Sequence, residues 1–179
     1  MPTVTVEIRA EPVTRYLQDL QGKLGNLRPV LTEMGEAMLA RVQDRFDRAQ
    51  APDGTPWAAN SPVTIARYLG RYGNSYTKTG KLSKAGARRA GGKKPLQGET
   101  GSLRGTIHYT VSGDTLTLGS PMVYAAVQQF GAKAHAFGRA PWGNIPARPF
   151  LPVNATGELD AGEEAVLLEI LQGWLNSKG

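Results

Sequence analysis

The chain has 179 residues, of which 40% are apolar and 20% are charged, and it contains no cysteine. A chain of this length can bury a core without disulfides or metal, and the missing cysteines exclude disulfide scaffolds, cysteine nucleophiles and thiolate metal sites. No stretch approaches the roughly 18–20 apolar residues that span a bilayer, and residues 1–10 lack the basic start and apolar run of a signal peptide. We therefore expect one soluble domain over residues 1–179, made in a cytoplasm and without a membrane partner.

The net charge of +6 is unevenly distributed along the sequence. Residues 67–104 include ten Lys or Arg residues and one acid, Glu99, so this segment carries +9. The rest of the chain has eleven basic and fourteen acidic residues and carries −3. The basic charge thus belongs to one segment, and the overall pI does not by itself indicate a nucleic-acid-binding protein.

The first three predicted elements are a strand and two helices. Residues 3–9 alternate between polar and apolar side chains, which is the period of a half-buried strand. Residues 11–25 have apolar residues at helical spacing and end at glycines, which indicates a short helix. Residues 27–50 show the clearest pattern, an amphipathic helix that Pro52 brings to an end. The apolar stripe of this helix consists of Leu31, Met34, Met38, Val42 and Phe46.

A short helix and a long basic loop are predicted next. Ser61 and Pro62 are typical of an N-cap and a first helical residue, and Gly70 is suited to end that helix. Residues 71–100 are rich in Gly, Lys, Arg and Ser and poor in large apolar groups. Long irregular segments inside a domain are usually functional or disordered, so we expect a flexible, poorly ordered basic loop.

Residues 101–120 predict a β-hairpin with a two-residue Gly-Asp turn at residues 113–114. The facing pairs that this turn sets are Val111 with Leu116 and Tyr109 with Leu118. The apolar side chains then share one face and the threonines share the other, as the pleat requires.

The last third of the chain predicts two helices joined by extended chain. Residues 122–130 form a short helix closed by a glycine, and residues 145–153 contain three prolines that restrict them to extended or edge-strand structure. Asp160 and Glu163 resemble a capping box at the start of a final helix over residues 160–176. The elements together predict an α+β fold, in which a small, mostly antiparallel sheet is packed by the long amphipathic helix and the C-terminal helix.

Motifs for catalysis, cofactors and metals are missing from the sequence. The two histidines, His108 and His135, have no partner at metal-ligand spacing. There is no GxGxxG, P-loop or GxSxG motif, and the acidic residues are scattered over predicted helix surfaces. We therefore predict no catalytic residue, no cofactor and no metal site, and a protein that is not an enzyme.

Three clusters of residues carry a resemblance to a known family. The first is Phe46, Pro52-Asp53-Gly54 and Trp57. The second is Leu96 to Leu103, in which Gly98-Glu99-Thr100-Gly101-Ser102-Leu103 leads into the hairpin. The third is Val123-Tyr124-Ala125, Gln128-Gln129-Phe130-Gly131 and Ile145-Pro146-Ala147-Arg148-Pro149-Phe150-Leu151-Pro152. In this order, over roughly residues 30–175, the clusters resemble the phage virion morphogenesis family, which includes the tail completion protein S of P2-like phages and protein G of Mu-like phages.

The resemblance implies a small α+β subunit that acts in tail completion or head–tail joining. Its implied place is the tail or neck of the virion, after assembly in the cytoplasm of the host bacterium. Its implied partners are further copies of itself, in a ring for which six copies is the natural expectation, and the tail tube, tail terminator or head-connector proteins of the phage.

Two alternatives stand for three residues near the proline-rich segment. Trp57, Arg148 and Phe150 belong either to the core and its rigid edge or to a subunit interface, where Trp and Arg are favoured. Three prolines reduce the freedom of the unfolded segment. An arginine side chain at Arg148 can fix this segment by donating to a carboxylate or to a backbone carbonyl.

Two helices raise the question of what covers their apolar residues. In the short helix, Tyr124 and Phe130 are expected in the core, with the glutamines at 128–129 exposed between them. The final helix is apolar over so wide an arc that we expect burial on two sides, one by the domain and one by a neighbouring subunit. The interface residues predicted on this helix are Val166, Ile170 and Trp174.

The basic loop leaves three alternatives open, which are solvation, ordering on an acidic partner surface, and contact with DNA at the head–tail junction. Tyr68, Tyr72 and Tyr76 are interleaved with the charges and are able to stack on bases. The alternative function is therefore a nucleic-acid-binding protein that uses residues 67–104. The candidate contacts with DNA or an acidic partner are Lys78, Lys81, Lys84, Arg88, Arg89, Lys93 and Lys94.

Overall fold

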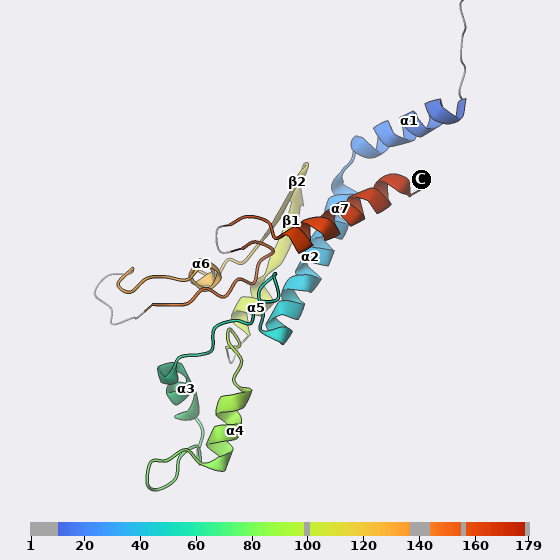
Figure 1. The fold of residues 1–179 in the computed structure, drawn as a ribbon. Coiled ribbons are helices and arrows are strands. Elements are labelled where there is room, and N and C mark those ends of the chain that lie inside the picture. Colours follow the sequence, from blue (N-terminus) through green and yellow to red (C-terminus); the bar gives the residue numbers. More distant parts are fainter. Residues whose placement is uncertain (1–10, 99–100, 137–143, 155–156, 178–179) are drawn as a thin grey trace, which may run out of the picture.

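The computed structural model describes residues 11–98, 101–136, 144–154 and 157–177, which form the predicted α+β fold (Figure 1). The elements are α1 (Glu11–Leu24), α2 (Arg28–Arg48), α3 (Pro62–Leu69), α4 (Lys84–Gly92), α5 (Ser102–Thr106), β1 (His108–Ser112), β2 (Thr115–Gly119), α6 (Ala125–Phe130) and α7 (Ala161–Asn176). The strand predicted over residues 3–9 lies outside the described residues.

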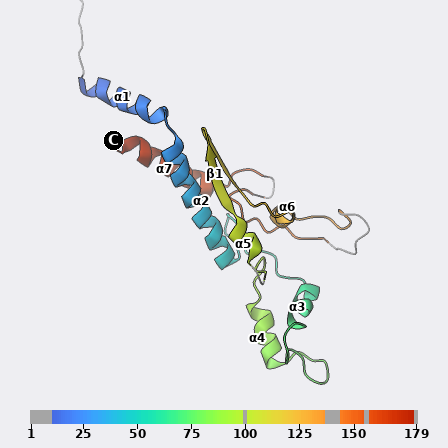
Figure 2. The same ribbon diagram turned by 180° about the vertical axis from the view of Figure 1, so that it is seen from behind.

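The helix α2 is the central element of the molecule, and its predicted extent and inward-facing stripe are confirmed. The hairpin and α7 pack against it. Figures 1 and 2 show α1 beyond its N-terminal end and α3 and α4 beyond its C-terminal end. Its stripe faces inward because Met38, Val42 and Phe46 recur at helical spacing, and all three are buried. It ends at Ala49, which has a left-handed φ of 55° and donates its N–H to the Arg45 carbonyl.

The hydrophobic core lies around the C-terminal half of α2. The ring of Phe46 is at its centre, 5.3 Å from the ring of Trp57 and 5.6 Å from that of Phe150. The other buried members are Val42, Ala51, Leu103, Ile107 and Ala125. Because large aromatic side chains contribute much of the apolar area buried in a small core, this cluster joins α2 to segments that are far apart in the sequence.

The hairpin has the predicted register, with Val111 opposite Leu116 and Tyr109 opposite Leu118. Its threonines at residues 110, 115 and 117 are exposed, so the predicted division of the two faces is also confirmed. One side chain fixes the hairpin on α2. The ring of Tyr109 lies so close to Gly35 that a Cβ there would be 2.4 Å from the ring.

The segment before the hairpin corrects one prediction. Residues 102–106 form the short helix α5 and not the first part of a strand. Gly101 turns the chain with a φ of 61°. One helical turn then places Leu103 and Ile107 on the same side, and both reach the core.

The basic segment corrects another prediction, because it is folded and not a loop. Tyr76 and Leu82 form an isolated β-bridge, and the helix α4 follows. Ser83 is the N-cap of α4, and its hydroxyl accepts a hydrogen bond from the N–H of Gly86. Gly86 is buried against the backbone of Ser75, where a Cβ would lie 2.1 Å from the carbonyl oxygen. A glycine that lowers intrinsic helix propensity is thus required here by tertiary packing.

The helices α3 and α7 begin where the sequence predicts, whereas α6 begins at Ala125 and not at residue 122. Ser61 caps α3 by accepting from the N–H of Thr64, and Gly131 ends α6 with a φ of 74°. Asp160 caps α7 by accepting from the N–H of Gly162. Glu163 does not complete a capping box, because its carboxylate points into the protein and binds two arginines of α2.

Candidate interaction surfaces

The proline-rich segment over residues 145–153 is held in place by hydrogen bonds to the chain around Trp57. Trp57 donates its indole N–H to the carbonyl of Pro149 over 2.8 Å. Arg148 donates to the carbonyls of Ala58 and Ala59, at 2.8 and 3.0 Å. Burial lowers the pKa of Arg148, because its charge is met here by carbonyl dipoles and not by a carboxylate. The segment is therefore anchored by arginine and tryptophan within the chain.

Gln129 performs the same task from α6 and corrects the expected orientation of that helix. Its side chain is only 1% exposed. Its Oε1 accepts from the N–H groups of Phe150 and Leu151, both at 2.9 Å, and its Nε2 donates to the carbonyl of Val153. The prolines prevent this segment from pairing as a regular strand. The buried side-chain amide of Gln129 makes the backbone hydrogen bonds that a neighbouring strand would otherwise make.

The aromatic residues at the two ends of α6 are exposed as a consequence. Tyr124 is 41% exposed and Phe130 is 47% exposed, so the prediction that they belong to the core is wrong. Gly131 explains the orientation, because it lies where a Cβ would be 2.7 Å from the carbonyl oxygen of Ile145. That close backbone contact turns the face of α6 bearing Gln129 toward the proline-rich segment.

An ion cluster joins α2 to α7. The Glu163 carboxylate accepts two hydrogen bonds from Arg41, both at 2.8 Å, and lies 2.6 Å from Nη2 of Arg45. Arg45 also donates to the carbonyl of Phe150, so the cluster reaches the proline-rich segment. Burial tends to raise the pKa of Glu163, but the hydrogen bonds and charges of the two arginines outweigh it, and this pKa is lowered.

The apolar residues of α7 are incompletely covered. This helix, all of which the structure describes, buries one side chain only, and that is the charged Glu163. We call its apolar residues the α7 face. They are Val166, Leu167, Leu168, Ile170, Leu171, Trp174 and Leu175, and each is half-buried or exposed. Leu168 is 49% exposed. A helix this apolar is normally covered on most sides, so the α7 face is a candidate subunit interface.

The far end of α7 is fastened to α1. The ammonium group of Lys23 lies 3.2 Å from the carbonyl oxygens of both Trp174 and Leu175, and it also donates to the carbonyl of Ser177. A cation at the last turn of a helix is favoured by the helix dipole. Leu24, next to this lysine, is 57% exposed. This end of the molecule therefore presents more apolar surface beside the α7 face.

Residues 60–98, with α3 and α4, form a lobe that we call the basic lobe. Some of its lysine and arginine side chains stabilise the lobe through contacts within it. Arg89 lies over the ring of Tyr72 and donates to the carbonyl of Gly73, while Lys93 lies over the ring of Tyr68. The rings of Tyr68 and Tyr72 also meet edge to face, with their centroids 5.1 Å apart. These cation–π and aromatic contacts stabilise the lobe together with the burial of Leu69, which is 1% exposed.

Other cations of the basic lobe face solvent. Those exposed among the predicted contacts are Lys78, Lys81, Lys84, Arg88 and Lys94. Of these, Lys94 donates to the carbonyl of Asp47 and so ties the lobe to the end of α2. Tyr76 is 44% exposed, whereas Tyr68 and Tyr72 are engaged with cations and with each other. The exposed surface of the lobe thus includes the Lys78, Lys81, Lys84 and Arg88 group together with Tyr76.

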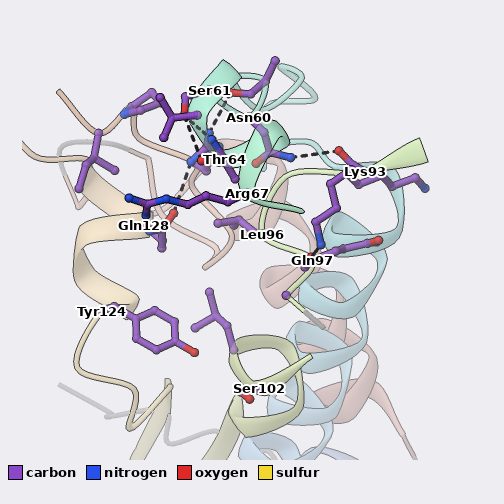
Figure 3. A pocket seen from close by; sticks show the side chains of 18 of the residues that line it. Asn60, Ser61, Thr64, Arg67, Lys93, Leu96, Gln97, Ser102, Tyr124 and Gln128 are labelled. Atoms are coloured by element: carbon purple, nitrogen blue, oxygen red, sulfur yellow. Dashed lines mark hydrogen bonds between the residues drawn. The ribbon is translucent and has the colours of Figure 1, made fainter. Parts of the chain in front are cut away.

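A cleft of about 960 Å³ separates the basic lobe from α6 (Figure 3). Its walls are α3, the segment after α4, α6 and the proline-rich segment. Arg67, Lys93, Lys94 and Arg148 contribute to its lining, and none of the described residues that line it is acidic. Figure 3 shows Asn60, Lys93 and Gln97 joined by hydrogen bonds along one wall.

The predicted interface residues thus divide into two groups. Trp57, Arg148 and Phe150 are buried within the chain, so the core alternative describes their positions. Val166, Ile170 and Trp174 are half-buried on α7, and their part in a subunit interface stays a prediction. Sequence reasoning missed Gln129, Glu163 and Arg45. The sequence gives little indication that these three residues are buried, since a polar residue in a helix is ordinarily exposed.

Two further observations concern the part of the chain that the structure describes. Within it, no group of three His, Cys, Asp or Glu side chains is arranged to hold a metal ion. Among its helices, none combines the length and apolar character needed to cross a lipid bilayer.

The fold and these surfaces define a class of small α+β protein with an incompletely covered apolar helix and a basic lobe. A sequence model of the phage virion morphogenesis family matches residues 8–176, which is nearly the whole chain. The chain belongs to this family, and it is a bacteriophage assembly protein associated with the virion. Comparisons with curated proteins and with solved structures gave no match.

Proposed function

We propose that this protein is a structural subunit of the phage tail or neck, which completes the tail or joins it to the head by binding other subunits. The observation that carries the proposal is the α7 face, where none of seven apolar residues is fully covered by the chain. Burial of apolar area drives most protein association. The family membership supports an assembly role, and the family resemblance favours a ring, with six copies as the expectation.

In this proposal the two ends of the molecule serve different contacts. The α7 face, with Leu24 beside it, binds the next copy of the protein. The basic lobe, beyond the C-terminal end of α2 (Figure 1), is directed at an acidic surface of a tail tube, tail terminator or head-connector protein. The proposed single domain extends over the whole chain, because α2 and the proline-rich segment link both ends.

The proposal is tested by the mass of the purified protein in solution, measured by light scattering after gel filtration. The wild type should form an oligomer of defined mass. Leu168→Glu should shift it to the monomer, because a charge on the α7 face cannot be desolvated in an interface without a partner. Ala165→Glu places the same charge on the polar side of α7 and should leave the mass unchanged. A monomeric wild type, or an unchanged mass for Leu168→Glu, would refute the proposal.

A second function is favoured by one observation, the exposed group of Lys78, Lys81, Lys84 and Arg88. These side chains can neutralise DNA phosphates without any specific fold. If all four do so, DNA affinity should fall about 100-fold between about 50 and 200 mM salt. Replacing the four with Ala should abolish most of this dependence, while Lys133→Ala, also exposed, should not. DNA binding that ignores salt or survives the fourfold replacement would exclude this function.

A further inference from the structure

The two-stranded sheet has an edge, along β2, that pairs with no other strand within the described residues. In that part of the chain the sheet has two strands, β1 and β2. The two-residue turn makes Ser112 and Thr115 a hydrogen-bonded pair, and such pairs alternate along an antiparallel ladder. The backbone N–H and C=O groups of Leu116 and Leu118 therefore point outward from β2. They present a row of groups ready to pair with another strand.

The edge of β2 is the more accessible of the two. Both strands of the hairpin pack on α2, β1 more extensively than β2 (Figures 1 and 2). Tyr109 of β1 is packed on Gly35 of α2, whereas the Leu116 and Leu118 side chains are half-buried. A new strand at β2 would extend the sheet on that side and cover these leucines further.

The sequence of β2 has none of the features that protect an exposed edge from pairing with another strand. Proteins protect such edges with lysine, proline, a bulge or a very short strand. The five residues of β2 are Thr115, Leu116, Thr117, Leu118 and Gly119, with neither a charge nor a proline. The absence of these features favours the pairing of this edge with another strand.

The segment that fits this edge is in the chain itself. Residues 3–9 read Thr-Val-Thr-Val-Glu-Ile-Arg, which alternates as β2 does and has apolar residues at Val4, Val6 and Ile8. If this segment pairs with β2, its valines fall on the leucine face and its threonines on the threonine face. Seven extended residues reach roughly 23 Å, which is enough to cover the five residues of β2.

The direction of α1 decides which copy receives the segment. Residues 3–9 precede α1, and this 14-residue helix is about 21 Å long. Figure 1 shows that the start of α1 lies at its far end from the hairpin. We propose that residues 3–9 of one copy pair with the β2 edge of the next copy. This inference rests on the proposed function, because it needs neighbouring copies. Repeated head-to-tail exchange of this kind gives a ring when the rotation from one copy to the next closes.

Cysteine cross-linking tests the pairing, because the chain has no native cysteine. A Thr5→Cys protein is mixed with a Thr117→Cys protein and oxidised, and a disulfide-linked dimer is expected. Thr110 is the control, because it lies directly opposite Thr117 on the same exposed face but one strand further from the edge. A Thr110→Cys protein should give little dimer. Thr3→Cys and Glu7→Cys extend the test to the neighbouring registers.

Three results would overturn the pairing. They are the absence of a dimer at all three donor positions, an equal yield with Thr110→Cys, or a disulfide formed only within one chain when both cysteines are in the same molecule. Deleting residues 1–9 separates this inference from the proposed function. The deletion should lower the oligomer mass while circular dichroism shows the fold retained. If the deleted protein keeps its mass and Leu168→Glu loses it, the strand pairing is wrong and the assembly role stands.

Discussion

At the scale of single residues, one carboxylate is buried, although charged side chains are ordinarily exposed. Glu163 is 1% exposed and is held by Arg41 and Arg45. Removing one partner of a buried ion pair costs more than the pair contributes, because the other charge is left without compensation. Here that charge is Arg45, which is also buried.

Glu163→Gln should therefore lower the free energy of unfolding by about 3 kcal/mol, near the lower end of the cost of breaking a buried pair. The side-chain amide keeps the shape and part of the hydrogen bonding but not the charge. Urea denaturation measures the effect. Glu164→Gln is the control, because Glu164 is exposed on the same turn of α7, and this variant should change stability very little.

The same carboxylate makes stability depend on pH. The pKa of Glu163 is lower in the folded protein than its ordinary value. Its contribution is therefore complete above the ordinary pKa of 4.5 and is lost as the pH falls through the lower, folded value. Thermal unfolding should show the difference between wild type and Glu163→Gln constant from neutral pH to pH 5 and shrinking below the ordinary pKa. A constant difference at all pH values would contradict this assignment.

A glycine sets the distance between α2 and the hairpin. At Gly35 a Cβ would lie 2.4 Å from the ring of Tyr109, so Gly35→Ala must move the ring or the strand. We expect a loss of about 1–3 kcal/mol, as for other overpacked positions. Gly22→Ala in α1 is the control, because nothing lies within 4 Å of that position. It should be neutral or stabilise the protein by about 0.5–1 kcal/mol through helix propensity. Equal effects in urea denaturation would contradict the close packing of Tyr109.

At the scale of elements, the sequence predicts what local rules determine. The stripe of α2, the Ser61 and Asp160 caps and the hairpin register depend on spacing and turn chemistry, and all were confirmed. Gln129 and the helix α4 were not predicted, because their causes are distant in sequence. Gln129 faces inward to satisfy a backbone about twenty residues later. The helix α4 is glycine-rich, and contacts with tyrosines before it stabilise it.

The packing of α4 can be tested without disturbing the main core. Gly86→Ala would place a Cβ 2.1 Å from the backbone oxygen of Ser75, so α4 must separate from the turn beneath it. We expect faster trypsin cleavage at the lysines and arginines of the basic lobe, since cleavage follows local opening. Gly91→Ala is the control, because Gly91 is in the same helix with nothing within 4 Å. Unchanged cleavage in Gly86→Ala would show that α4 does not depend on this contact.

At the scale of the whole molecule, the two kinds of surface lie in different places (Figure 1). The helix α7 crosses α2 and ends beside α1, whereas the basic lobe lies beyond the C-terminal end of α2. Residues 67–104 carry +9 and the rest of the chain carries −3. Two kinds of assembly are therefore conceivable on physical grounds, an apolar one through α7 and an electrostatic one that places a basic lobe against the acidic body of the next copy.

Salt separates these two kinds of assembly. Attraction between exposed charges is screened over about 10 Å at 0.1 M salt and over much less at higher salt, whereas apolar association does not weaken under these conditions. The oligomer mass should therefore be the same at about 0.05 M and about 0.5 M NaCl, as measured by light scattering. An oligomer that dissociates in the higher salt would assign the assembly to the basic lobe. In that case the α7 face of this protein would bind a different virion protein.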